Sequence, residues 1–361
     1  MFLKRFQSLN GVIFMKRAIP AIFLVLILAL GGIALLLKPG GESKFEEGLR
    51  YLNGDGVERD YARAFELFSE GAKAGDDDAQ AYLGYCYIFG RGTAKDLAKA
   101  KELCREAAER GNANAQAFWA LAISEKKGSA DEENSDLKKG LELCKKSAES
   151  GNSWGLAVLA RYYLVGFGVD RDEKKAFELS KKSADGGNLC GQTLLGTCYF
   201  EGTGVEKDKQ RGLELVQKSY KAGDTHAPIL LSLIYVYDNK LLMDSADKGE
   251  PLASCIMGCC YEKGELVDRN LEKALELYRS SAKQGDMFGL FYLGKCYLRG
   301  IGIERDEKKA FELIEKSANL GFYEAQDLLG ECYLNGWGVE KDEAKAKMWR
   351  DTAKKNEVQF Y

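Results

Sequence analysis

The sequence predicts an all-α protein in which about nine stacked helical hairpins form a solenoid, preceded by one membrane-spanning helix. Two regularities predict the solenoid. Aspartate or asparagine residues recur, mostly 36 residues apart, where a second helix would begin, and glycines recur at the same interval where it would end. A run of twenty uncharged residues near the N-terminus predicts the membrane helix. A hairpin this short cannot bury its apolar face alone, so each one must stack on its neighbours.

Segment 153–188 shows the hairpin unit in its clearest form. Small and apolar residues fall at helical spacing in its first half and predict one buried stripe: Ala157, Leu159, Ala160 and Tyr163. Gly166 and Gly168 end this helix, and Asp172 is placed to cap the second one. Gly187 ends the second helix, because glycine adopts the left-handed conformation without a steric penalty. Asn188 then caps the first helix of the next unit.

The same pattern divides the chain after residue 40 into nine units. They are 41–76, 77–112, 113–152, 153–188, 189–224, 225–250, 251–286, 287–322 and 323–361. The expected caps of the second helices are Asp60, Asp96, Asp136, Asp172, Asp208, Asn270, Asp306 and Asp342. The glycines that end these helices are Gly75, Gly111, Gly151, Gly187, Gly223, Gly249, Gly285 and Gly321.

Two units depart from this pattern. Unit three has four extra residues within the polar stretch 126–135, which predicts a surface loop. Unit six, 225–250, lacks the glycine loop and the opening turns of its second helix, so Asp238-Asn239-Lys240 must form the turn. We expect a bend or a change of superhelical phase near 238–250. The predicted parts of the solenoid are a first stack, 38–224, the shortened repeat, 225–250, and a second stack, 251–361.

The repeated motif LGxxY…GxGVxxDxxKAxxL…SAxxG resembles the Sel-1-like repeat, a branch of the tetratricopeptide-like helical solenoids. It stands as LGTCYFEGTGVEKDKQRGLELVQKSYKAG at 195–223 and LGKCYLRGIGIERDEKKAFELIEKSANLG at 293–321, and again at 329–355. The resemblance covers everything after the N-terminal segment. It implies a right-handed superhelix whose first helices line a concave face. It also implies scaffolding or adaptor work rather than catalysis.

The N-terminal segment has a different character. A basic stretch, 1–17, precedes the uncharged run 18–37, which as a helix would span roughly 30 Å, the thickness of the hydrocarbon core of a bilayer. We expect an uncleaved anchor here; a cleaved signal peptide and a buried hydrophobic helix are the alternatives. Four basic residues before the run against three after it favour an N-terminus inside and an exported solenoid, periplasmic or extracellular. A cytosolic or secreted solenoid is the alternative.

Charge and motif content exclude several function classes. From Lys38 onward the chain carries 48 basic and 55 acidic residues, a net charge of −7, without a basic stripe for nucleic acid. It has no GxSxG, HExxH, P-loop or dinucleotide motif, and His226 is its single histidine. We therefore expect no enzymatic activity and no cofactor.

The ten cysteines are predicted to be small core residues. Five share one repeat position, namely Cys86, Cys198, Cys260, Cys296 and Cys332, and equivalent positions lie about one repeat apart, too far for a disulfide. Cys104 and Cys144 share a second position. So many unpaired thiols fit an oxidising compartment poorly. Cys255, Cys259 and His226 are weak candidates for a metal site, because their ligand set is incomplete.

The expected site is a partner-binding groove. The concave positions implied by the resemblance are Tyr85, Ile88, Phe89, Trp154, Arg161, Val165, Phe200 and Tyr237. Exposed aromatics with an arginine among them are typical of protein interfaces, although such residues also pack between repeats. The sequence thus predicts a membrane-anchored scaffold that binds a protein or peptide. The alternatives are a secreted or periplasmic factor acting on a host protein or an envelope polymer, and a regulatory subunit of an enzyme.

Overall fold

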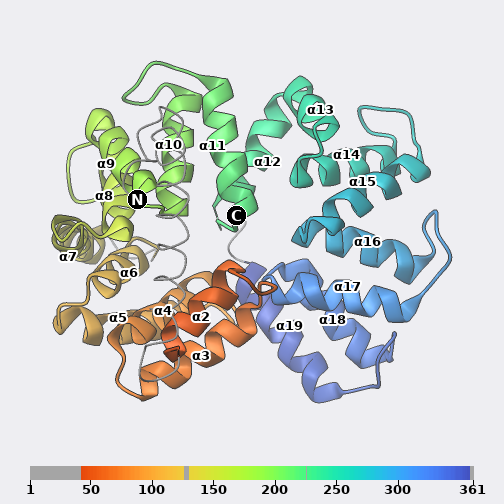
Figure 1. The fold of residues 1–361 in the computed structure, drawn as a ribbon, viewed down its shortest axis with the longest axis horizontal. Coiled ribbons are helices and arrows are strands. Elements are labelled where there is room, and N and C mark those ends of the chain that lie inside the picture. Colours follow the sequence, from red (N-terminus) through yellow and green to blue (C-terminus); the bar gives the residue numbers. More distant parts are fainter. Residues whose placement is uncertain (1–41, 126–129, 225, 358–361) are drawn as a thin grey trace, which may run out of the picture. The chain divides into compact units, whose positions relative to one another are not determined.

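The computed structural model of the protein describes residues 42–125, 130–224 and 226–357. Within these ranges every helix pairs with its sequence neighbour, so that nine hairpins follow one another in chain order (Figure 1). The residues from Lys44 onward form one compact unit. The predicted all-α arrangement of consecutive hairpins is therefore confirmed for the described part of the chain.

The helix pairs are α2 (Lys44–Asn53) with α3 (Tyr61–Lys73), α4 (Asp77–Phe89) with α5 (Leu97–Glu109), α6 (Ala113–Ser124) with α7 (Ala130–Glu149), α8 (Ser153–Val165) with α9 (Glu173–Asp185), α10 (Leu189–Glu201) with α11 (Lys209–Ala222), α12 (Ala227–Tyr237) with α13 (Asn239–Asp247), α14 (Pro251–Lys263) with α15 (Leu271–Lys283), α16 (Met287–Arg299) with α17 (Glu307–Asn319), and α18 (Tyr323–Asn335) with α19 (Glu343–Glu357). In the described residues no helix is long and apolar enough to cross a bilayer. The segments 1–17 and 18–37 lie outside the described residues, so the membrane anchor stays a prediction.

First and second helices bury different fractions of their surface. In α4 buried residues occur all around the helix, because α4 packs against α5 and against first helices of neighbouring hairpins. Second helices such as α5 bury one stripe, Ala100, Cys104 and Ala107 among them, and expose their charged residues. The first helices therefore form the core, and the second helices form the solvated outer layer.

A buried serine attaches the second helix of four repeats to the start of the first helix. The serine hydroxyls donate to backbone carbonyls at 2.7–2.9 Å, in the pairs Ser147–Ala113, Ser183–Ser153, Ser219–Leu189 and Ser317–Met287. All four side chains are fully buried, and each hydrogen bond satisfies a hydroxyl that would otherwise be costly to bury. This contact explains the recurring Ser-Ala or Ser-Tyr pair near the end of each of these second helices.

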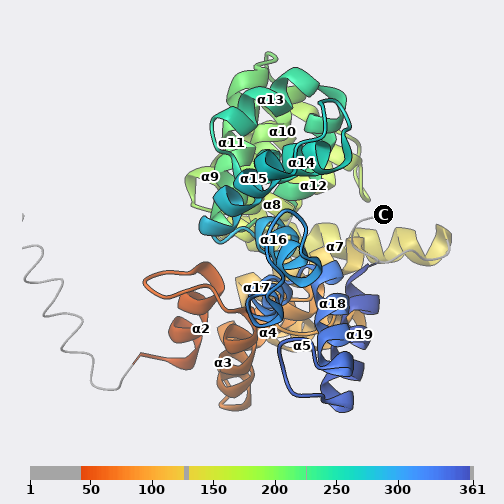
Figure 2. The ribbon, with the colours of Figure 1, turned by 90° about the vertical axis from the view of Figure 1, so that its right-hand side faces the viewer.

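Seven of the eight caps predicted for second helices are confirmed. The carboxylate of Asp172, for example, accepts a hydrogen bond from the Lys175 N–H at 2.9 Å. All eight closing glycines, Gly75 to Gly321, have a positive φ. The prediction for Asp136 is wrong, because α7 begins at Ala130 and Asp136 lies inside it. The expected loop over 126–135 is correspondingly wrong from residue 130 onward. Once a helix is nucleated, each added residue gains a backbone hydrogen bond, and α7 extends past its neighbours into solvent (Figure 2).

The glycine loop between the two helices of a repeat touches the previous repeat. A Cβ on Gly204 would clash with the carbonyl oxygen of Glu173, the first residue of α9. In the seventh hairpin the equivalent residue is Leu266, the single non-glycine residue with positive φ (63°) among the described residues. The preceding second helix, α13, has nine residues instead of the usual thirteen. No helix start therefore lies where the Leu266 side chain would collide with it.

The shortened repeat has the two predicted helices, but its turn is shorter than the expected Asp238-Asn239-Lys240, because Asn239 and Lys240 already belong to α13. Asp238 alone separates α12 from α13, and its carboxylate caps α13 by accepting a hydrogen bond from the Leu241 N–H at 3.0 Å. A hydrophobic cluster runs through this repeat from Leu213 of α11 to Met257 of α14. The expected bend near 238–250 stays a prediction.

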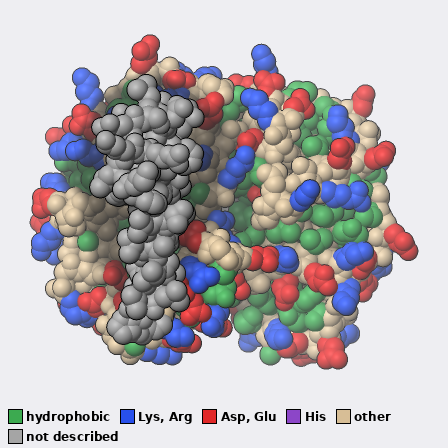
Figure 3. Space-filling view, in the orientation of Figure 1, with side chains coloured by type: hydrophobic (Ala, Val, Ile, Leu, Met, Phe, Trp, Pro, Cys, Tyr) green, Lys and Arg blue, Asp and Glu red, His purple; other side chains and the backbone are tan. Residues whose placement is uncertain are grey.

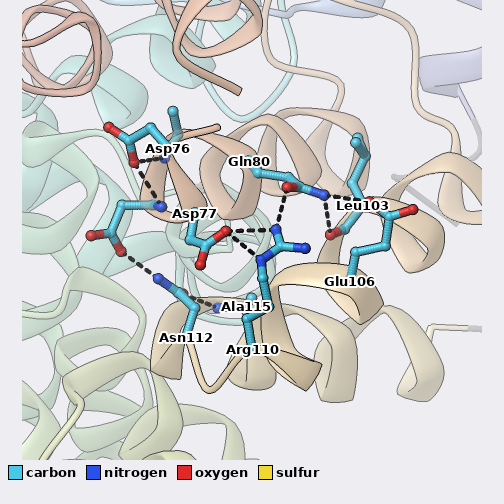
Figure 4. A network of polar contacts seen from close by, with 10 residues as sticks. Asp76, Asp77, Gln80, Leu103, Glu106, Arg110, Asn112 and Ala115 are labelled. Carbon is cyan, nitrogen blue, oxygen red and sulfur yellow. Dashed lines mark hydrogen bonds and ion pairs between the residues drawn. The ribbon is translucent and has the colours of Figure 1, made fainter. Parts of the chain in front are cut away.

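Polar residues at the starts of the first helices connect successive repeats (Figure 4). The side-chain amide of Asn112, the cap of α6, donates to Asp78 of α4 at 2.8 Å. Asn114 bonds the same carboxylate at 3.2 Å, and Asn152, the cap of α8, donates to Asn114 at 2.8 Å. Arg110 bridges Asp77 and Gln80 at 2.8 and 2.7 Å. These contacts set the register of the second, third and fourth hairpins.

The early and late hairpins of this unit also meet. Helices α2–α5 lie beside α17–α19 in both views (Figures 1 and 2). Arg91, in the loop after α4, donates to the carbonyls of Leu320 and Gly223, each at 3.3 Å. At the surface Lys316 pairs with Glu58 at 3.3 Å. Residues more than 200 positions apart are therefore hydrogen-bonded.

Candidate binding surfaces

The predicted groove residues differ widely in exposure. Ile88 (1% exposed) and Tyr85 (8% exposed) belong to the hydrophobic core, so their assignment to an open groove is wrong. The reason is that α4 is covered on several sides by neighbouring helices. Phe89, Trp154, Arg161 and Phe200 are half-buried. Val165 and Tyr237 are exposed, and Tyr237 is exposed to 86% of its surface.

Four aromatic residues from three repeats form one cluster. The ring centroid of Tyr85 lies 4.7 Å from that of Phe89, 5.3 Å from that of Phe118 and 5.5 Å from that of Trp154. Tilted and edge-on pairs at these distances are the favourable arrangements for aromatic rings. Tyr85 and Trp154 also border a pocket of about 260 Å³. These two residues, both assigned from the sequence to an open groove, instead pack against each other and the surrounding core.

Arg161 is held by an ion pair. Its guanidinium lies 2.7 Å from the carboxylate of Glu125, which follows α6. Burial by itself raises the pKa of Glu125, but the charge of Arg161, its hydrogen bond to the carboxylate and the nearby charge of Lys95 together outweigh burial and hold this pKa below its ordinary value. Phe200 is also in contact with a cation, because the Lys209 amine lies 5.7 Å from the centre of its ring.

The three weak metal candidates do not converge. The imidazole of His226 lies edge-on against the ring of Phe89, with centroids 5.6 Å apart. The Cys255 thiol donates to the Ser281 hydroxyl at 3.1 Å, and the Tyr278 hydroxyl donates to Cys259 at 3.4 Å. Within the ranges that the structure describes, no group of three or more His, Cys, Asp or Glu side chains could hold a metal ion. The candidate site is therefore not formed there.

The cysteines are core residues, as predicted. All ten are free thiols, and eight are buried. Burial raises the pKa of Cys198 to about 11 and that of Cys144, Cys296 and Cys332 to about 12 each. Such thiols stay protonated at neutral pH and are poor nucleophiles.

Among the described residues, the largest group of exposed large apolar side chains in one repeat lies on the shortened repeat. We call it the α12 surface, and it consists of Leu233, Val236, Tyr237 and Met243. Positions 233, 236 and 237 share one face of α12, since residues three and four apart are neighbours on a helix. In a full repeat, the first helix is followed by the glycine loop and the opening turns of the second helix. Unit six lacks both, so the C-terminal end of its first helix, α12, is left uncovered.

Sequence reasoning found Tyr237 but missed the rest of the α12 surface. The signal was the run from Ala227 to Tyr237, APILLSLIYVY, which is apolar on every face. A helix that is apolar all round is normally buried on all sides. Because the second helix of this hairpin is shortened, one apolar side of α12 has no helix packed against it.

Comparisons with known proteins agree with the repeat pattern. The model of the Sel1 repeat matches eight segments: 47–76, 77–112, 113–152, 155–188, 191–224, 251–286, 288–322 and 324–349. These follow eight of the nine predicted units, and the unit without a match is the shortened one, 225–250. No curated protein matches the chain.

Several solved structures are similar to this chain. The protective antigen c5321 of uropathogenic Escherichia coli, which displays an SLR fold, is 29% identical over 87% of this chain and 79% of its own, with a TM-score of 0.34. A Sel1 repeat protein from Oxalobacter formigenes is 26% identical over 80% of this chain and 75% of its own, with a TM-score of 0.35. The immunity protein Pa5087 from Pseudomonas aeruginosa is 18% identical over 68% of this chain and 83% of its own, with a TM-score of 0.37.

Proposed function

The chain belongs to the Sel1 repeat family, and from this premise we propose that it is a non-catalytic scaffold that binds a protein or peptide partner through the α12 surface. The observation that carries the proposal is the exposure of Tyr237 together with Leu233 and Val236 on one face of α12, followed by exposed Met243 on the next helix, α13. Large exposed apolar groups on one face mark interaction sites, and tyrosine is enriched among the residues that dominate binding energy.

The surface charge supports a protein partner over nucleic acid. Lysine and arginine side chains alternate with aspartate and glutamate over the part of the face in Figure 3 that is drawn in colour, and this part shows no continuous basic stripe. Binding rather than catalysis is also supported by the surroundings of the only histidine. His226 packs against Phe89, and the nearby Asp224 carboxylate accepts hydrogen bonds from Thr193 and from the Ala227 N–H.

Affinity capture with the full-length chain tests the partner site. The partner recovered with the wild type is purified, and its affinity is measured for the double variant Val236→Ser, Tyr237→Ser. We expect a loss of at least about tenfold, the usual effect of removing a central aromatic contact. Met348→Ser is the control, because Met348 is an exposed apolar residue on α19, away from the α12 surface. Equal affinity of the double variant and the control would contradict the proposal.

We further propose that residues 18–37 anchor the chain in a membrane and that the solenoid is exported. The twenty uncharged residues and the basic segment before them support this orientation. Because the native thiols are predominantly buried, a reporter cysteine is placed at the exposed position Lys174. Labelling of Lys174→Cys by a membrane-impermeant maleimide, in cells with a permeabilised outer envelope, supports export. Labelling only after lysis places the solenoid in the cytosol.

A further inference from the structure

A second candidate site lies where three distant parts of the unit meet. It is a pocket of about 260 Å³. Arg59 and Arg91 reach it from the loops of the first two hairpins, and Leu320 reaches it from the end of α17. The starts of α12, α14 and α16 complete its wall.

Neither of the two arginines forms an ion pair with an acidic side chain of the described residues. Arg91 is 8% exposed, and its Nη atoms donate only to the carbonyls of Leu320 and Gly223. Its guanidinium lies over the ring of Tyr61, 3.9 Å from the ring centre. Arg59 donates to the carbonyls of Asn53 and Ala222, at 3.1 and 2.8 Å. Neither guanidinium has a carboxylate of a described residue within 4.0 Å.

Both guanidiniums also have unused donors. Three buried side-chain polar atoms in the described part of the chain lack a hydrogen-bond partner, and two of them are the Nε atoms of Arg59 and Arg91. Each guanidinium has five N–H donors, of which Arg91 uses two. A buried cation without a counter-charge is costly unless something else supplies the charge. The buried guanidinium of Arg91 and the half-buried one of Arg59 both border one pocket, and each has a buried Nε without a partner, which indicates an anionic ligand.

The acidic residues of the pocket already accept hydrogen bonds, and Asp286 is the cap of α16. Asp224 accepts hydrogen bonds from the Thr193 hydroxyl and the Ala227 N–H, at 2.7 and 3.0 Å. Asp286 accepts from the Gly289 N–H and the Ser281 hydroxyl, both at 2.9 Å, and from the Tyr220 hydroxyl. These two carboxylates would repel a doubly charged phosphate more strongly than a single carboxylate. The ligand charge that fits best is therefore −1.

Much of the remaining wall is apolar. Phe89, Pro228, Pro251 and Met287 line it, and the last three lie in the first turns of α12, α14 and α16. Its polar residues include Lys221, whose amine pairs with the Glu250 carboxylate at 2.9 Å, and Gln284, which donates to the Gly249 carbonyl at 3.0 Å. Helix N-termini add positive potential that favours an anion. The volume is below the range of about 300–1,000 Å³ for drug-sized ligands, so it suits about one amino-acid residue.

We infer that this pocket binds the C-terminal carboxylate of a peptide that ends in an apolar residue. The carboxylate lies between Arg59 and Arg91, and the apolar side chain contacts Phe89 and Met287. Arginine suits this role because its planar guanidinium can hold a carboxylate with two parallel hydrogen bonds. The inference extends the proposed peptide-binding function to a second site whose residues are separate from the α12 surface.

Calorimetric titration of the full-length chain tests the inference. The probe is N-acetyl-leucine, and the matched neutral compound is N-acetyl-leucine amide. We expect the amide to bind at least about tenfold more weakly than the acid, because hydrogen bonds to a charged group are the strong ones. Arg91→Gln and Arg59→Gln should each weaken binding of the acid about tenfold. Arg171→Gln is the control, since Arg171 pairs with Glu173 on the surface and should leave the affinity unchanged.

Several results would overturn the inference. Equal affinity for acid and amide, unchanged affinity in Arg59→Gln, or no saturable binding of the acid would each do so. Tighter binding of inorganic phosphate than of N-acetyl-leucine would overturn the assignment to a carboxylate. If circular dichroism shows that Arg91→Gln does not fold, Arg59→Gln decides alone. Partner capture through Val236 and Tyr237 is measured separately, so a failure here differs from a failure of the proposed function.

Discussion

The backbone N–H of Lys95 donates a hydrogen bond to Oδ1 of Asn356 at 3.2 Å, and so joins the second hairpin to the last helix. Asn356 is 3% exposed, and its side-chain amide also donates to Gln326 Oε1 at 2.9 Å. One buried asparagine thus holds together parts of the chain that are 261 residues apart in sequence.

Asn356→Ala should therefore destabilise the protein more than an ordinary surface change. The substitution leaves the Lys95 N–H and the Gln326 amide oxygen without their partners, which costs about 1–3 kcal/mol of the free energy of unfolding. Urea denaturation followed by circular dichroism measures the loss. Asn335→Ala is the control, because Asn335 is exposed and bonds only the Glu331 carbonyl one turn earlier. If both variants are equally stable, the contact does not hold the two parts together.

Leu266→Gly should stabilise the protein. Leu266 has a φ of 63° and is 60% exposed, so its removal relieves backbone strain and loses little buried area. A left-handed conformation costs a non-glycine residue about 1–2 kcal/mol, of which the greater freedom of glycine in the unfolded chain offsets a part. We expect a net gain of about 0.5–1 kcal/mol in thermal or urea unfolding.

The opposite substitution in a full repeat serves as the comparison. In Gly204→Ala the new Cβ collides with the Glu173 carbonyl oxygen and also adopts a positive φ, so we expect a loss of about 2 kcal/mol or more. A loss of stability in Leu266→Gly would show that the Leu266 side chain makes contacts that outweigh the strain.

Tyr85→Ala and Tyr237→Ala should separate core from surface. Tyr85 lies in the aromatic cluster, and its truncation should cost about 3–5 kcal/mol of the free energy of unfolding. Tyr237 is 86% exposed, so Tyr237→Ala should change stability by no more than about 0.5 kcal/mol while it weakens partner binding. Similar melting temperatures for the two variants would contradict this assignment.

The buried thiols predict that the folded protein loses stability at high pH. The pKa of Cys144, Cys296 and Cys332 is raised from 9.0 to about 12 in the folded chain. Their contribution to stability is fully present below pH 9 and is lost as the pH rises towards 12, because only the unfolded chain ionises these thiols readily. At pH 8 a thiol reagent should label these three residues in urea but not in the native protein, as read by mass spectrometry. Rapid native labelling at these positions would show that they are accessible.

Much of the fold follows from local signals. The cap of α9 by Asp172 and the positive φ of Gly187 depend on residues within one or two helical turns, and such contacts can be read along the chain. The deletion in unit six could be located the same way. The start of α7 was missed because a polar segment carries no apolar periodicity from which its helical length can be judged.

The sequence by itself determined the hairpins, their order, their caps and the place of the shortened repeat, because these depend on interactions between residues close together in the chain. The tertiary structure alone decided which candidate residues are accessible. Tyr85 is buried by Phe118 and Trp154 of the next two repeats, whereas Tyr237 is exposed next to the shortened α13. The tertiary structure also brought Arg91 into hydrogen-bond contact with Leu320, which is 229 residues away in sequence, and with Gly223, which is 132 residues away. Burial and unpaired charge are set by whatever packs against a residue in space, and no periodicity along the chain specifies that.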